Sequence, residues 1–245
     1  MTAPFPTRKQ EEWRYADLDA LKPVWEQIGE VATLAVAAGE TLEEIWLPTT
    51  DDVQVRRVRL SLGEGASARI FALNNASVYG RIELEVSLAS DAGFSLFAAN
   101  IGDGLSTNEI VTNVRHFGER GMSRQVIRSV LNGKATGSYL GKVEVARGAQ
   151  QTDGEQSVKA MLLDRGATAN CKPELEIYAD DVKCAHGATV GELDPMQLFY
   201  AQSRGLDPAS ARALLLEGFV MGLWDSADDP DAISHAARDA LRRVV

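Results

Sequence analysis

Two side chains that could bind a metal ion stand close together in the last third of the chain, Cys184 and His186. On an extended strand, two residues separated by one other residue project from the same face. A thiolate and an imidazole together suit iron or zinc. Two ligands do not complete a site, because structural zinc takes four protein ligands and catalytic zinc usually three. The pair is therefore either part of a site that other residues or another chain complete, or a small buried thiol beside a hydrogen-bonded histidine in a turn.

Other motifs with a known chemistry are missing or incomplete. Residues 137–142 are one residue short of a phosphate-binding loop, and residues 102–107 lack the third glycine of a dinucleotide-binding fingerprint. Both stretches are predicted to be ordinary turns. Of the remaining histidines, His116 lies in a strand-like run and stays a candidate, whereas His235 in the last helical segment is interpreted as an ordinary hydrogen-bonded imidazole. No nucleophile elbow of the form Gly-x-Ser-x-Gly occurs in the sequence.

The composition of the 245 residues argues against nucleic-acid and membrane partners. A net charge of −10 repels phosphate backbones. No membrane span of roughly 20 apolar residues is present, and the N-terminus lacks the apolar core of a secretion signal. Two cysteines, Cys171 and Cys184, form no disulfide framework in a chain of this length, so both are expected to be free thiols. These features predict a cytoplasmic protein.

Short β-strands are predicted for most of the chain between residues 53 and 185. Apolar and polar residues alternate there, as in residues 82–88, and glycines separate the runs. No long amphipathic helices intervene, which disfavours a doubly wound α/β fold and leaves a sandwich, a barrel or a solenoid. No clean repeat period distinguishes these three. Ahead of the strands, residues 8–21 predict a short helix that stops before Pro23.

Three Asp-Pro pairs predict a helical C-terminal region. Aspartate as N-cap and proline in the first helical turn favour helix starts at Asp194, Asp207 and Asp229. Gly205 is a candidate left-handed C-cap for the first helix. The three helices are predicted to cover residues 195–204, 209–223 and 231–244.

The second of these helices is apolar around most of its circumference, so it must be covered on more than one side. Its C-terminal end carries Phe219, Met221, Leu223 and Trp224. Two interpretations stay open for this set. The residues either pack in the core between helices, or they form a docking face for another protein, where Met and Trp are favoured.

Several stretches together resemble the SufB/SufD family of the SUF iron–sulfur cluster assembly machinery. They are TRKQEEWRYADL near the N-terminus, HFGERGMSRQVIRSVLNGKATGSYLGKVEV, AQQTDGEQSVKAMLLDRGA, and KPELEIYADDVKCAHGATVGELD with the later LLLEGF. The SufD branch is the more similar one, because His186 is followed by Gly187 where SufB-like chains are expected to carry a His-Glu pair. The chain is shorter than familiar SufD proteins, so it resembles a compact form.

The resemblance implies a mostly β fold, a right-handed parallel β-helix over residues 51–191. A helical or irregular segment over residues 1–50 would precede it, and a C-terminal helical domain over residues 192–245 would follow. It further implies a non-catalytic scaffold subunit that pairs with a SufB-like paralogue and receives sulfur from a cysteine desulfurase through the complex. A SufC-like ATPase would dock on the C-terminal helices, where Phe219, Met221, Leu223 and Trp224 are the candidate contacts. Isolated from these partners, the chain would be a candidate homodimer.

By the same resemblance, His186 matches a histidine at the interface with the SufB-like partner, with Cys184 beside it. His186 would then be a ligand in a shared site for transient iron or an Fe–S cluster. The isolated chain is expected to hold no cofactor, and a reduced flavin is a candidate for the assembled complex. The alternative function is a β-helix polysaccharide lyase or hydrolase with Asp180 and Asp181 as acid and base. Neighbouring strand residues point to opposite faces, which argues against that pair.

Overall fold

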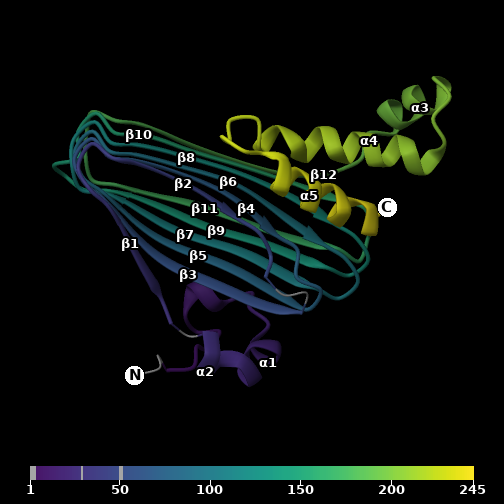
Figure 1. Ribbon diagram of the computed structural model, residues 1–245, viewed down its shortest axis with the longest axis horizontal. Helices are drawn as coiled ribbons and strands as arrows, with labels where there is room; N and C mark the ends of the chain where they lie inside the picture. Colours follow the sequence, from purple (N-terminus) through teal and green to yellow (C-terminus); the bar gives the residue numbers. More distant parts are fainter. Residues whose placement is uncertain (1–3, 29, 50–51) are drawn as a thin grey trace.

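The computed structural model describes residues 4–28, 30–49 and 52–245. Within these ranges the strands form two six-stranded sheets, in the orders β1-β3-β5-β7-β9-β11 and β12-β10-β8-β6-β4-β2. All neighbouring strands are parallel. Successive strands alternate between the sheets, so the chain coils into a parallel β-solenoid (Figure 1). This arrangement resolves the choice that the sequence pattern left open between sandwich, barrel and solenoid.

Each turn of the solenoid contributes one strand to each sheet. The first sheet holds β1 (Ala32–Val36), β3 (Val53–Leu62), β5 (Tyr79–Leu88), β7 (Thr107–His116), β9 (Thr136–Val145) and β11 (Thr168–Ile177). The second sheet holds β2 (Thr41–Trp46), β4 (Ser67–Asn74), β6 (Gly93–Gly102), β8 (Met122–Leu131), β10 (Asp153–Leu162) and β12 (Lys183–Glu192).

Side chains at equal positions stack on one another from turn to turn. Ile70 of β4 pairs with Leu96 of β6, and both are fully buried between the sheets. Ile82 of β5 likewise pairs with Ile110 of β7. The interior is therefore a set of columns, each built from the inward-facing residues of a period-two pattern. This geometry makes every inward side chain the neighbour of two others, one in the preceding turn and one in the next.

The C-terminal helices cover the outer face of the second sheet. They are α3 (Pro195–Ser203), α4 (Pro208–Val220), the 3-10 helix η3 (Met221–Leu223) and α5 (Asp231–Arg243). Asp194 and Asp207 accept hydrogen bonds from backbone amides of their first helical turns, and Gly205 has a φ of 99° after α3. Both N-caps and the glycine cap were predicted. The third helix differs, since Pro230 occupies its N-cap position without a side-chain cap.

The helix predicted over residues 8–21 is not continuous. The segment consists of the short pieces η1 (Glu11–Trp13), α1 (Leu18–Leu21), η2 (Lys22–Val24) and α2 (Trp25–Ile28). Pro23 sits in the first turn of η2 and does not end the helical segment. Trp13 and Trp25 pack edge to face against each other, and both are buried in one cluster with Tyr79 of the first sheet. Figure 1 shows the N-terminal helical pieces beside this sheet.

Two sequence-based boundaries need correction. The β region begins with β1 at Ala32, well before residue 51, since β1 and β2 pair with β3 and β4. Residues 137–142 are no turn, because they lie inside β9, where Gly141 faces the interior. Residues 102–107 do form the turn between β6 and β7. The strands β1 and β2 thus lie in the segment that was expected to be helical or irregular.

Candidate functional site

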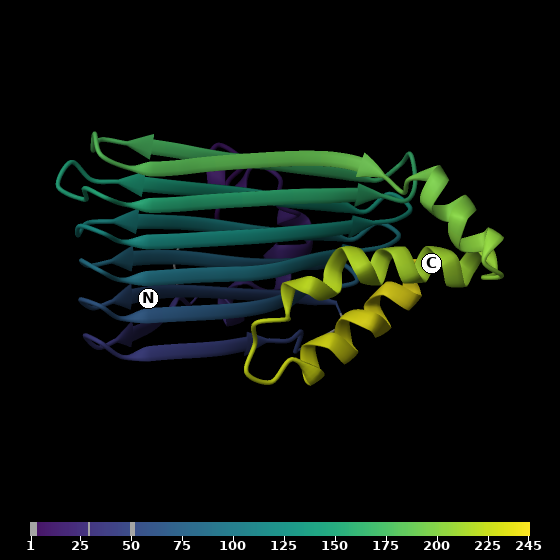
Figure 2. The same cartoon turned by 90° about the horizontal axis from the view of Figure 1, so that it is seen from above.

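The last turn of the solenoid leaves both sheets with a free edge. Among the described strands, β11 is bonded only to β9 and β12 only to β10. Figure 2 shows these two strands, in green, at the end of the stack that the helices α4 and α5 do not cover. A strand edge presents unpaired backbone N–H and C=O groups that can pair with another chain. The inward-facing side chains of this turn also lack a following turn to cover them.

Cys184 and His186 lie on β12 at this open end. Their register partners on β10 are Gly154 and Gln156. Gln156 is buried in the solenoid interior and Cys184 packs against the same interior cluster, so β12 directs both of its candidate ligands inward. Cys184 is half-buried, whereas His186 is exposed. The predicted common face is therefore present, and it is the interior face of the last turn.

The second cysteine belongs to the same end. Cys171 of β11 is the register partner of Tyr139 and packs against the interior cluster that also contacts Cys184. Both thiols are free, as predicted. Burial raises the pKa of Cys171 and of Cys184, so both favour the neutral thiol at neutral pH. As metal ligands, both would have to lose this proton.

In the part of the chain that the structure describes, no group of three or more His, Cys, Asp or Glu side chains could hold a metal ion. His186 and Cys184 are therefore at most part of a donor set. Their chemistry suits iron, and their position at an uncovered end leaves space for donors from another chain. A site shared with another chain, as the family resemblance implies, stays a prediction.

Behind this open end lies a polar cluster that sequence reasoning missed. The Tyr139 hydroxyl donates to Gln125 Oε1 at 3.1 Å and accepts from Gln156 Nε2 at 2.9 Å. It also lies 3.2 Å from Thr112 Oγ1. All four side chains are at most 2% exposed. In the sequence, the two glutamines are ordinary polar residues of the predicted β region. They indicate a polar cluster only once the register between the strands is known.

His116, the other histidine candidate, is a buried residue at the end of β7. Its Nε2 lies 2.9 Å from Ser123 Oγ, and burial lowers its pKa to about 4. The imidazole is therefore neutral at physiological pH. Because it is 1% exposed, it serves as a packed hydrogen-bonding group in the interior. It does not share the open end with His186.

The predicted docking residues lie largely in the core. Leu223 and Trp224 are 4% and 1% exposed and pack with α5 and the second sheet, while Phe219 and Met221 are partly buried against the same cluster. For Leu223 and Trp224 the core interpretation is thus correct. The exposed apolar side chains are on α3 and α4 instead. They are Met196, Phe199, Tyr200 and Leu214, between 57% and 70% exposed.

Asp180 and Asp181 do not lie on a strand, so the objection that neighbouring strand residues point to opposite faces does not apply to them. They lie in the turn between β11 and β12, and both are exposed. An acid–base pair needs two carboxyl groups in different environments, one of which favours the protonated form. Two exposed neighbours in one turn do not provide that difference. The geometry therefore gives no support to a polysaccharide-cleaving site at these residues.

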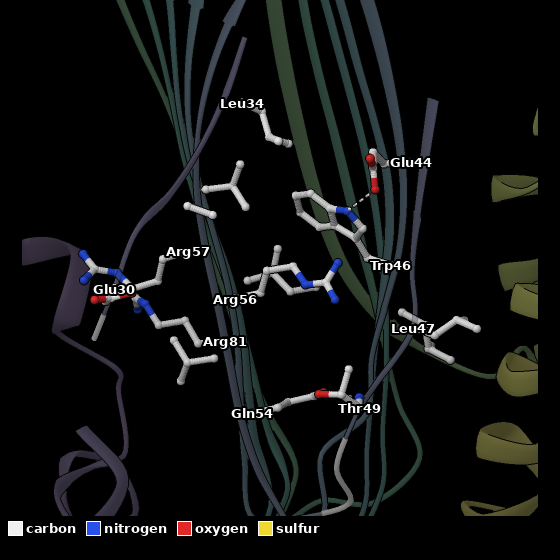
Figure 3. A pocket seen from close by; sticks show the side chains of 15 residues that line it. Glu30, Leu34, Glu44, Trp46, Leu47, Thr49, Gln54, Arg56, Arg57 and Arg81 are labelled. Atoms are coloured by element: carbon white, nitrogen blue, oxygen red, sulfur yellow. Dashed lines mark hydrogen bonds between the residues drawn. The ribbon is translucent and has the colours of Figure 1, made fainter. Parts of the chain in front are cut away.

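A cavity of about 400 Å³ lies at the other end of the solenoid, inside its first turn (Figure 3). The Arg56 guanidinium lies 4.9 Å from the centre of the Trp46 ring, whose Nε1 donates to Glu44 Oε2 at 3.3 Å. Burial lowers the pKa of Arg56, and the nearby Glu44 opposes that shift. These side chains fill much of the first turn, and no residue predicted to be functional lies there.

In the described residues no helix is long and apolar enough to span a membrane. Residues 31–219 match the family described as SUF system FeS cluster assembly, SufBD core domain. The match starts at the first strand of the solenoid and reaches the end of α4.

The matches to individual proteins cover smaller parts of this chain than the family match does. The iron-sulfur cluster assembly protein SufD of Escherichia coli is 39% identical over 107 residues, which are 44% of this chain and 25% of that protein. An iron-sulfur cluster assembly SufBD family protein of Synechocystis is 30% identical over 176 residues, 71% of this chain and 39% of that protein. SufD of Bacillus subtilis is 32% identical over 120 residues, 49% of this chain and 28% of that protein. The matched stretches thus span well under half of each relative.

Proposed function

The chain belongs to the SufBD core family of the SUF iron–sulfur cluster assembly system, and from this membership we propose that it is a SufD-like, non-catalytic scaffold subunit. In this role it pairs with a SufB-like paralogue and contributes to acquiring iron or a nascent cluster. The iron or cluster is cargo in transit. The proposal is supported by the names of the relatives in Escherichia coli and Bacillus subtilis, both iron–sulfur cluster assembly proteins.

One observation carries the proposal furthest: the only exposed imidazole on the inward face of β12 stands where two strand edges are free. A second β-solenoid that pairs with this end would bring its own side chains over His186 and Cys184. The four or so donors that an iron site needs would then come from two chains. This arrangement accounts for the small donor set of the present chain without requiring further residues from it.

The ATPase is proposed to dock on the C-terminal helices, at a surface that differs from the one first expected. Met196, Phe199 and Tyr200 on α3 and Leu214 on α4 are exposed apolar side chains, and α3 extends beyond the end of the sheets (Figure 2). Exposed apolar patches on a folded protein mark interaction sites. Sulfur delivery by a cysteine desulfurase, a reduced flavin in the complex and a cytoplasmic location remain predictions that follow from the same family role.

The proposal is tested by purifying the tagged chain from its native cells with its partners. We expect a SufB-like and a SufC-like protein to co-purify, and the complex to carry iron and acid-labile sulfide. His186→Ala should leave complex formation intact and lower the affinity for iron by about tenfold or more, since even the loss of a side chain that only orients a metal ligand costs about 10- to 100-fold; the iron and sulfide content should fall with it. His235→Ala on α5 is the matched control.

Recovery of the chain alone under gentle conditions, as a monomer or a homodimer, would contradict the scaffold role. A His186→Ala complex with the full content of iron and sulfide would remove His186 from the site while leaving the family role in place.

A further inference from the structure

The polar cluster around Tyr139 stands out because the same columns are aliphatic in the two turns before it. Gln125 and Gln156 follow Ile70 and Leu96 in one column. Tyr139 follows Ile82 and Ile110 in the facing column. These two columns thus change from aliphatic to polar in the last turns, and the next residue of the glutamine column is His186.

Packing alone does not explain this change. Gln125 Nε2 and Gln156 Oε1 are buried without a hydrogen-bond partner among the residues that the structure describes. A buried polar atom without a partner destabilises a protein, and aliphatic side chains fill the same positions two turns earlier. Buried polar groups in native proteins usually have a hydrogen-bond partner, so each exception calls for an explanation. For Gln156, the explanation is to be sought in the side chain that follows it in the column.

The position of the Tyr139 hydroxyl depends on a glycine. A methyl group on Gly141 would overlap the Tyr139 hydroxyl and its ring, so the tyrosine lies along its own strand over the glycine. In this orientation the hydroxyl reaches across to the glutamine column and accepts from Gln156 Nε2. That bond fixes the amide of Gln156 at its nitrogen and leaves the carbonyl oxygen as a free acceptor.

Gln156 and His186 are direct neighbours in the parallel ladder between β10 and β12. Neighbouring strands are about 4.8 Å apart, and side chains at paired positions project from the same face. A buried amide oxygen without a partner therefore stands beside an exposed imidazole in the same column. Histidines that bind metals usually donate their second N–H to an acceptor, which fixes the tautomer and the orientation of the ring.

We propose that Gln156 is a positioning residue whose Oε1 accepts a hydrogen bond from one imidazole N–H of His186. The other ring nitrogen then faces the open end of the solenoid with its lone pair free. Tyr139 holds the Gln156 amide in place, and Gly141 makes room for Tyr139. The functional significance of this hydrogen bond rests on the proposed function, because a fixed direction of the free lone pair helps His186 only in binding iron.

The test measures the tautomer of His186 directly, by long-range proton–nitrogen NMR correlation on the ¹⁵N-labelled chain. The chain holds three histidines, so His186→Ala identifies the signals of the residue. The spectra are recorded at a pH of about 9, where a histidine of ordinary pKa is neutral. We expect one tautomer to dominate, and Gln156→Leu to move the ratio about three- to tenfold toward that of the urea-unfolded chain, as one neutral hydrogen bond allows.

Two further variants separate positioning from general damage. Lys159→Leu changes an exposed side chain on the outer face of the same strand, β10, and should leave the tautomer ratio unchanged. Gln156→Glu keeps an acceptor at the position and should retain the dominant tautomer even where Gln156→Leu proves too unstable to study. Amide spectra of each variant confirm that the solenoid is folded.

The outcomes are distinct. An equal tautomer ratio in the original chain and in folded Gln156→Leu, or a loss of the dominant tautomer in Gln156→Glu, overturns the proposal. If the tautomer ratio shifts in Gln156→Leu but the iron content of the complex formed by this variant is unchanged, the positioning role is supported and the proposed role of His186 in iron acquisition is refuted. A shifted ratio with reduced iron content supports both.

Discussion

A substitution at Trp224 tests which residues of the C-terminal helices belong to the core and which form a docking surface. Its side chain is 1% exposed and packs between α4, α5 and the second sheet. Removing a buried tryptophan side chain usually costs about 3 to 5 kcal/mol. The indole Nε1 has no hydrogen-bond partner among the described residues, so truncation also removes a buried unsatisfied donor, which offsets about 1 kcal/mol or more. We therefore expect Trp224→Ala to destabilise the protein by about 3 kcal/mol.

The assay is urea and thermal unfolding followed by far-ultraviolet circular dichroism, which does not depend on the deleted fluorophore. For a chain of this size, about 3 kcal/mol corresponds to a drop of about 6 to 12 °C in the unfolding temperature. Phe199→Ala is the matched control. Phe199 is 66% exposed on α3, so its truncation should change stability by less than about 0.5 kcal/mol.

In a binding assay with the proposed SufC-like ATPase, substitutions at the two residues should have the opposite pattern of effects from that seen in unfolding. Phe199→Asp should weaken binding while the unfolding temperature stays the same, and Trp224→Ala should affect binding only through its stability. If Trp224→Ala leaves the unfolding temperature unchanged and abolishes binding, the assignment of Trp224 to the core is wrong. The docking face would then lie at the end of α4, as the sequence first suggested.

Two further predictions address the solenoid interior. Gly141→Ala should destabilise the chain by about 1 to 3 kcal/mol, because the added methyl group overlaps Tyr139 and overpacks the interior; thermal unfolding measures this, and an unchanged unfolding temperature would contradict the observed position of the tyrosine. His116 is neutral when folded because burial lowers its pKa from 6.5 to about 4. As the pH falls, His116 therefore takes up a proton in the unfolded chain before it does so in the folded chain. The free energy of unfolding keeps its full value above about pH 6.5 and decreases by about 3 kcal/mol as the pH falls to about 4. Urea unfolding across this range should show a shallower pH dependence for His116→Gln, and equal slopes would refute the argument.

The strands from Val53 onward could be predicted because alternating side chains face either the interior or the outside of each sheet. The two strands before them were missed for an identifiable reason. In β2 (Thr41–Trp46) the inward position next to Trp46 is Glu44, which accepts the indole N–H. A carboxylate at an inward position interrupts the apolar alternation, so the pattern no longer indicates a strand. Tertiary contacts, here with Trp46 and Arg56, make that carboxylate acceptable.

The two exposed or half-buried residues of the candidate site could be predicted from their residue types, but the buried residues behind them could not. A cysteine and a histidine two apart are visible in any sequence, whereas Gln156 and Tyr139 gain meaning only from the columns in which they stand. The spacing between successive residues of these columns varies from 26 residues (Ile70 to Leu96) to 32 residues (Tyr139 to Cys171), which hides the period from a sequence comparison. Register, and with it the neighbourhood of Gln156 and His186, is a property of the coiled chain as a whole.

The two free edges at the open end are not equivalent, and the difference bears on how a partner would pair. Pro173 lies in the middle of β11 and supplies no backbone N–H, a feature that natural edge strands use against unwanted pairing. No proline interrupts β12, and residues 185–190 in its middle carry small side chains apart from His186 and include no Asp, Glu, Lys or Arg. An edge of this kind favours association with another strand unless it is covered. We therefore expect a partner solenoid to pair through β12, the strand that carries Cys184 and His186, so that the same contact that covers the edge also completes the ligand set.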